Sequence, residues 1–136
     1  MCDQSLPYRH NSQFTTDITD IGWQSIFAAL LSSRLEKLNL HSNNMNEKAV
    51  TSLSDALLHN TTMKTLNLEG NRIITLAGWN AIFRLLRNPN FALEELHLRC
   101  NHITDEGLAN LANALETNSR LRELDLGSNN DVTDAG

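Results

Sequence analysis

The feature that most constrains the fold is a leucine-spaced segment that occurs four times, at intervals of 28 to 30 residues. The four copies begin at Leu35, Met63, Leu93 and Leu121, and they read LEKLNLHSNNM, MKTLNLEGNRI, LEELHLRCNHI and LRELDLGSNNDV. All fit L-x-x-L-x-L-x-x-N, with Met63 replacing the first leucine of the second copy. Self-similarity with a period of about 20 to 50 residues is typical of a solenoid, in which each unit buries its apolar side by stacking on its neighbours.

The first half of each copy predicts a short β-strand. In Leu96-His97-Leu98 the side chains alternate, so that the two leucines face one side and the histidine faces the other. A strand this short is not stable alone. We therefore expect the four segments to lie side by side in a parallel sheet whose leucine side is covered by the second halves.

The second half of each copy predicts an amphipathic helix. Four such segments begin at Ile18, Met45, Ile74 and Ile103, and they read ITDIGWQSIFAALL, MNEKAVTSLSDALL, ITLAGWNAIFRLLR and ITDEGLANLANALE. Apolar residues recur in them at intervals of three and four, which is the helical period. A suitable N-cap residue stands before each first turn, namely Thr19, Asn46, Thr75 and Thr104. Trp23 and Trp79 follow a glycine in two of the segments, where Val50 and Leu108 stand in the others, so we expect both rings to pack in the core.

Residues 18–136 resemble the leucine-rich repeat family, in particular its long-repeat, ribonuclease-inhibitor-like branch. The departures are Ala49, where the other copies have glycine, and single-residue insertions in the second and fourth copies. The resemblance implies an α/β fold, a curved right-handed β-α solenoid (a horseshoe segment) with a parallel sheet on the concave side and helices on the convex side. Strands lie about 4.8 Å apart and packed helices about 8–10 Å apart, so the stack must bend with the sheet inside.

Two regions complete the predicted organisation. Residues 1–17 are interpreted as an N-terminal tail or degenerate cap, and residues 18–136 as the repeat domain, with about four strand-bearing repeats of which the last is incomplete. The segment from Val132 begins another helix pattern that does not continue, which leaves the last strand without its cover. Because a solenoid needs a polar terminal cap, we expect the chain to be a fragment of a longer protein.

An asparagine recurs in each copy at the point where the chain must turn away from the strand. The four are Asn43, Asn71, Asn101 and Asn129. Backbone groups in such a turn are hidden by the next repeat and need internal partners, which an amide can supply as both donor and acceptor. The family resemblance implies that these residues form a structural asparagine ladder.

The residues between the leucines form columns on the concave face. One column, formed by Glu36, Lys64, Glu94 and Arg122, alternates in sign and is interpreted as structural. The other columns are polar and varied, as binding surfaces on rigid scaffolds are. The predicted partner-binding residues are Lys37, Asn39, His41, Thr65, Asn67, Glu69, Glu95, His97, Arg99, Glu123 and Asp125.

Composition and motifs argue against several other functions. The net charge is −5 and no basic cluster occurs, which disfavours nucleic acid. The N-terminus lacks the apolar region of a signal peptide, no apolar run is long enough to span a bilayer, and the two cysteines make no disulfide framework, so we expect a cytoplasmic monomer without membrane contact. No spacing of histidine and cysteine suits zinc, no cofactor motif occurs, and Cys100 is interpreted as an inert thiol, so we expect no metal, no cofactor and no enzyme.

The leading functional interpretation is a protein–protein interaction module that recognises another protein through the concave face and adjoining loops. Two alternatives remain open. The first is a GTPase activator resembling the Ran GTPase-activating protein, for which Arg72 is the only arginine in a loop after a ladder asparagine. The second is a structural spacer segment of a larger leucine-rich repeat protein.

Overall fold

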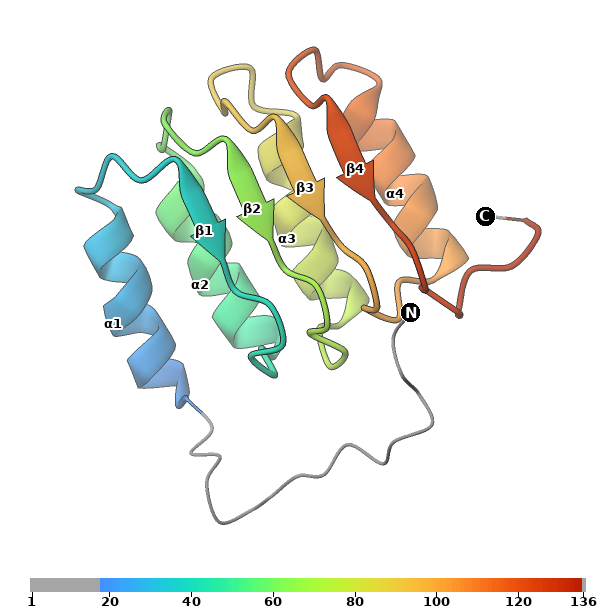
Figure 1. Cartoon of the computed structure of the whole chain (residues 1–136), viewed down its shortest axis with the longest axis horizontal. Coiled ribbons are helices and arrows are strands. Elements are labelled where there is room, and N and C mark those ends of the chain that lie inside the picture. Colours follow the sequence, from blue (N-terminus) through green and yellow to red (C-terminus); the bar gives the residue numbers. More distant parts are fainter. Residues whose placement is uncertain (1–17, 136) are drawn as a thin grey trace.

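A computed structural model of the chain describes residues 18–135, and the predicted N-terminal tail or cap lies outside the described residues. Helices and strands alternate along this part of the chain and form two layers, with the strands in front of the helices in Figure 1. The elements are α1 (Asp20–Leu30), β1 (Lys37–Asn39), α2 (Glu47–Leu57), β2 (Thr65–Asn67), α3 (Leu76–Leu86), β3 (Glu95–His97), α4 (Asp105–Leu115) and β4 (Glu123–Asp125).

The four strands form one parallel sheet in the order β1-β2-β3-β4. The central leucine of each strand is in register with the next, so Leu38, Leu66, Leu96 and Leu124 lie in one row. Each strand is joined to the next through a helix, as parallel pairing requires. The predicted α/β solenoid is therefore confirmed.

Each helix begins where its sequence predicts. The side chains of Thr19, Asn46, Thr75 and Thr104 accept hydrogen bonds from the backbone N–H three residues later, as N-caps do. Cross-repeat contacts also begin at these caps, as described below.

The core lies between the two layers and is made mostly of leucine. Leu66, Leu68, Leu96 and Leu98 are fully buried between the sheet and the helices, which confirms the predicted orientation of the strands. Trp23 and Trp79 are also buried. The ring of Trp23 stacks on Phe27 with a centroid separation of 5.3 Å, and Trp79 stacks on Phe83 at 6.3 Å, so the tryptophans are core residues as predicted.

A second set of asparagines organises the loops that return from each helix to the next strand. The side-chain oxygens of Asn60, Asn88 and Asn118 accept hydrogen bonds from backbone N–H groups two or three residues later. The Nδ2 group of Asn88 donates to the Leu58 carbonyl of the preceding repeat, and that of Asn118 donates to Leu86. These loops differ in length between repeats, which hid this second set from the sequence pattern.

None of the helices between residues 18 and 135 is long and apolar enough to cross a membrane.

Candidate functional site

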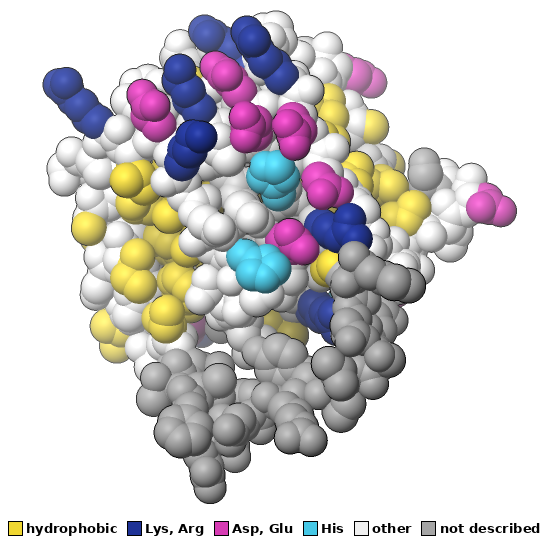
Figure 2. Space-filling model, in the orientation of Figure 1, with side chains coloured by type: hydrophobic (Ala, Val, Ile, Leu, Met, Phe, Trp, Pro, Cys, Tyr) yellow, Lys and Arg dark blue, Asp and Glu magenta, His cyan; other side chains and the backbone are white. Residues whose placement is uncertain are grey.

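The side of the sheet turned away from the helices is the predicted concave face, and we keep that name for it. The register places Lys37, Thr65, Glu95 and Glu123 in one row across the strands, and Asn39, Asn67, His97 and Asp125 in another. Backbone hydrogen bonds from Ser42 to Glu69, from Gly70 to Arg99 and from Cys100 to Gly127 align a third row, formed by His41, Glu69, Arg99 and Gly127. Figure 2 shows charged and histidine side chains gathered over the strands. The predicted binding residues are thus brought together on one surface.

Three of these residues also have a structural role that the sequence did not reveal. The Oδ1 atoms of Asn39, Asn67 and Asp125 each accept a hydrogen bond from the backbone N–H two residues later, at 2.9 to 3.0 Å. Such contacts end the strand by giving the chain a local turn. In the same row, β3 carries His97, whose Nε2 atom lies 3.9 Å from the Glu95 carboxylate.

One small cluster on the face is centred on Glu95. Its Oε2 atom accepts a hydrogen bond from the Thr65 hydroxyl at 3.2 Å and lies 3.9 Å from Nε2 of His97. The Glu95 side chain is 43% exposed and that of His97 is 24% exposed. Both groups can therefore reach a bound molecule while their neighbours limit the conformations they adopt.

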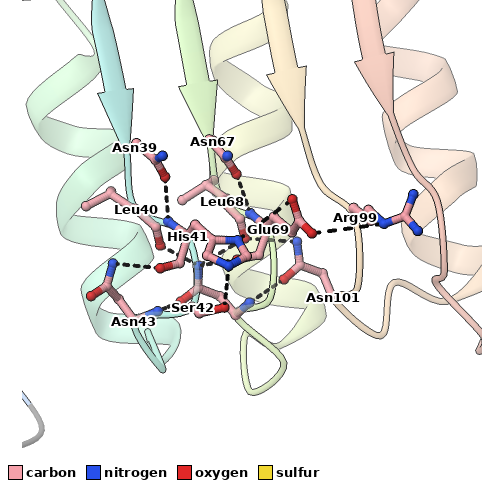
Figure 3. Close-up of polar contacts among 11 residues, drawn as sticks. Asn39, Leu40, His41, Ser42, Asn43, Asn67, Leu68, Glu69, Arg99 and Asn101 are labelled. Carbon is pink, nitrogen blue, oxygen red and sulfur yellow. Dashed lines mark hydrogen bonds and ion pairs between the residues drawn. The ribbon is translucent and has the colours of Figure 1, made fainter. Parts of the chain in front are cut away.

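A second cluster lies where the strands end (Figure 3). Glu69 stands between His41 and Arg99, with Oε2 at 3.7 Å from the His41 Nδ1 atom and Oε1 at 4.0 Å from the Arg99 Nε atom. These separations are long and the side chains are partly exposed, so each pair contributes little to stability. Beyond Arg99 the row ends at Gly127, and a Cβ atom there would stand 2.9 Å from the guanidinium. The glycine therefore leaves room for the Arg99 side chain.

The ladder asparagines connect successive turns. The Oδ1 atom of Asn71 accepts from the N–H groups of Asn43 and Met45, and that of Asn129 accepts from Asn101 and Ile103. The Asn71 N–H donates in turn to Asn101. Their Nδ2 groups donate to leucine carbonyls of their own and the preceding strand segments. Asn43 differs, because its side chain is exposed and its Nδ2 bonds only locally, to the His41 carbonyl.

The backbone just before each ladder asparagine has the same unusual conformation. The φ angle is 53° at Ser42, 73° at Gly70, 60° at Cys100 and 56° at Ser128. Residues other than glycine rarely adopt this left-handed region, and they do so where the surroundings enforce it. The ladder hydrogen bonds supply that enforcement.

A third set of cross-repeat contacts joins the starts of the helices. Asp20 accepts a hydrogen bond from Asn46 at 3.1 Å, Glu47 accepts one from Thr75, and Asp105 accepts one from Thr133. In each case an acidic residue in the first turn of one helix bonds the cap position of the next repeat. The Thr133 hydroxyl and N–H together hold the pKa of the Asp105 carboxyl below its usual value of 3.8.

Charge is unevenly distributed over the concave face. The two outward-facing residues of β1 are Lys37 and Asn39, whereas those of β4 are Glu123 and Asp125. The Arg99 guanidinium lies at the border of this acidic half. A ligand with basic groups toward β4 would match this distribution.

Among residues 18–135, no group of three or more histidine, cysteine, aspartate or glutamate side chains is arranged to hold a metal ion. Cys100 is buried and is not a free thiol, so its interpretation as an inert thiol was wrong about its chemical state. Arg72 is exposed in the turn after Asn71, beyond the end of β2.

The repeats are matched by a family model described as Leucine Rich repeat, at residues 59–82, 90–112 and 117–136. Human NACHT, LRR and PYD domains-containing protein 13 is 36% identical over 121 residues, which cover 88% of this chain and 11% of that protein. Human NACHT, LRR and PYD domains-containing protein 14 is 33% identical over 116 residues, which cover 84% of this chain and 10% of that protein. The chain therefore spans about a tenth of the length of these curated relatives.

A solved structure titled Leiomodin-1 Actin-Binding Site 2 has a similar fold. Its TM-score is 0.69 at 24% sequence identity, and the alignment covers 82% of this chain and 65% of that one. At this identity the likeness concerns the fold alone. Taken with the repeated strands, helices and asparagine ladder described above, these matches identify the chain as a leucine-rich repeat protein.

Proposed function

We propose that this chain is a protein-interaction module that binds another protein through the concave face. The observation that carries the proposal is the arrangement of polar side chains, one strand spacing apart, on a sheet whose other side packs against the helices. Rigid presentation lowers the entropic cost of binding, because few of these groups must be ordered when a partner arrives.

Arg99 is the side chain best suited to anchor such a partner. It projects from the end of β3, is 31% exposed, and has room beside Gly127. Arginine is enriched among the residues that contribute most to protein interfaces, since its planar guanidinium can donate several hydrogen bonds at once. Glu95 and Glu123 on the same half of the sheet would contact basic groups of the same partner.

The test compares the immobilised wild-type chain with two immobilised variants, and mass spectrometry identifies the proteins that each of them captures. The variants are Arg99→Glu on the concave face and Arg84→Glu on the exposed surface of α3, which make the same change in charge. We expect a captured protein that is retained by the wild-type chain and by Arg84→Glu and is lost from Arg99→Glu. Equal capture by all three chains, with unchanged far-UV circular dichroism, would exclude the concave site.

The ribonuclease-inhibitor-like branch, the cytoplasmic location and the monomeric state remain part of this proposal. The repeat length of 28 to 30 residues supports the branch, and binding through the concave face needs one copy only. Fractionation of cells that express the chain would test the location, and recovery in the membrane or secreted fraction would contradict it.

A further inference from the structure

The helical layer has a hollow on the side turned away from the sheet, where α3 packs beside α4 (Figure 1). The hollow has a volume of about 200 Å³ and is lined by Asn80, Phe83, Arg84, Arg87 and Asn110. The two arginines are exposed, the two asparagines are half-buried, and the aromatic ring is buried beneath them. We call this site, which two neighbouring repeats build together, the α3–α4 hollow.

Hydrogen bonds across the hollow hold its walls together and leave several donors unused. The Nδ2 group of Asn110 donates to Oδ1 of Asn80 at 2.9 Å, and the Arg87 guanidinium donates to Oδ1 of Asn113 at 2.8 Å. The Arg87 bond occupies only one of the several N–H groups of that side chain. Arg84 makes no hydrogen bond or ion pair with any residue between 18 and 135. Most of the guanidinium donors therefore face solvent.

The hollow is also a local concentration of positive charge. Its lining includes two arginines and no carboxylate, although the chain has a net charge of −5. Asp55 on α2 and Glu116 after α4 occupy the corresponding places in the flanking repeats. Neither of these carboxylates forms an ion pair with an arginine within the described part of the chain. Two guanidinium groups without a carboxylate partner are suited to bind oxyanions, which they can contact with paired hydrogen bonds.

The fold does not require arginine at these two positions. Among the helices between residues 18 and 135, α3 has a basic residue in its last turn, whereas α1, α2 and α4 have none. The residues at the corresponding positions of the other repeats are Ala28, Asp55 and Asn113, and Leu31, Leu58 and Glu116. Because three helices form without a cation near their C-terminus, the helix dipole does not account for the arginine pair.

We propose that the α3–α4 hollow binds an acidic segment of another protein, whose carboxylates contact Arg84 and Arg87. The stripe formed by Asn80 and the two arginines extends over seven residues of α3, or about 10 Å at the helical rise. Alternate side chains of an extended peptide lie about 6.5 Å apart on one side, so acidic residues at alternate positions can reach both guanidinium groups. A single small anion would be held only by exposed arginines, and such contacts are weak.

The experiment is a fluorescence anisotropy titration of the chain with a labelled short peptide in which glutamate alternates with alanine. A matched peptide has glutamine in place of every glutamate. We expect the chain to bind the glutamate peptide at least about tenfold more tightly than the glutamine peptide. The double variant Arg84→Ala, Arg87→Ala should lose this difference. Equal binding of both peptides to the wild-type chain, or an undiminished difference in the double variant, would overturn the proposal.

A second double variant controls for total charge. Arg34→Ala, Arg72→Ala removes two exposed arginines outside the hollow and changes the net charge by the same amount. This variant should bind the glutamate peptide as the wild type does, and an equal loss in it would overturn the proposal. Arg99→Glu should also leave peptide binding unchanged, because Arg99 lies at the concave face. The outcome for this hollow is therefore separate from the outcome for the concave site.

Nuclear magnetic resonance locates the bound peptide. The side-chain amide signals of Asn80 and Asn110 should shift when the glutamate peptide is added, whereas those of Asn39 and Asn67 on the concave face should not. Shifts confined to the concave face would overturn the proposal. A peptide with phosphoserine in place of glutamate should bind no more tightly than the glutamate peptide. If it binds at least about tenfold more tightly, the proposal of an acidic segment is overturned in favour of a phosphorylated one.

Discussion

At the scale of single residues, Asn101 is one of the buried side chains that connect successive turns. It is fully buried, its Oδ1 accepts from the Asn71 N–H, and its Nδ2 donates to the Leu68 carbonyl. Asn101→Ala leaves the buried Asn71 N–H without a partner, at about 1 to 3 kcal/mol for an unsatisfied group, whereas the Leu68 carbonyl keeps the hydrogen bond from Asn71 Nδ2. We expect urea unfolding to show a loss of about 1 to 3 kcal/mol in the free energy of unfolding.

Asn43→Ala is the matched control for that change. The Asn43 side chain is exposed and bonds only the His41 carbonyl, so its loss should cost less than about 0.5 kcal/mol. Equal destabilisation by the two alanine variants would mean that the buried ladder contributes nothing beyond a surface hydrogen bond.

Asp105 offers a pH-dependent prediction at the same scale. Since Thr133 lowers the folded-state pKa below 3.8, the contact contributes stability above that pH and is lost as the pH falls through the lowered value. An NMR titration should find the Asp105 carboxyl below 3.8 in the wild type and closer to 3.8 in Thr133→Val. Identical titration curves for the two proteins would exclude the hydrogen bond from the Thr133 hydroxyl as the cause of the lowered pKa.

At the scale of elements, replacing a glycine by alanine should have opposite effects on stability in two of the helices. A Cβ at Gly78 would stand 2.8 Å from methyl groups of both Ile74 and Val50, which are buried, whereas a Cβ at Gly22 would meet the partly exposed Ile18. Gly22→Ala should stabilise by about 0.5 to 1 kcal/mol through helix propensity. Gly78→Ala should destabilise by about 1 kcal/mol, because overpacking in the core exceeds that gain. Thermal unfolding of both variants tests this, and a stabilised Gly78→Ala would contradict the packing argument.

The elements were also the part of the molecule most open to prediction from sequence. The alternation of leucines predicted the strands, and the threonine and asparagine caps predicted where the helices begin. Strand alternation and helix capping can be predicted because each depends on residues close together in the sequence. The strand-ending role of Asn39, Asn67 and Asp125 was not predictable, since an exposed binding residue and a turn residue look alike in sequence. The bond between Asp105 and Thr133 depends on how two repeats stack, which neither repeat encodes alone.

At the scale of the whole molecule, stability should fall from the middle of the stack toward its ends. Repeat proteins are held by contacts between neighbouring units, and the central units have a neighbour on both sides. Native-state hydrogen exchange at low concentration should therefore find the strongest protection in α2, α3 and β2, and the weakest in α1 and β4. Uniform protection would indicate a single cooperative unit instead.

The binding role of the concave face can be tested most directly by site-specific photo-crosslinking. A benzoylphenylalanine replaces Glu95 on the concave face in one variant and Thr51, exposed on α2, in the other. If partners dock on the sheet, the Glu95 variant forms a defined adduct with another protein after irradiation in cell extract, and the Thr51 variant does not. An adduct from position 51 without one from position 95 would place binding on the helical side and contradict the account.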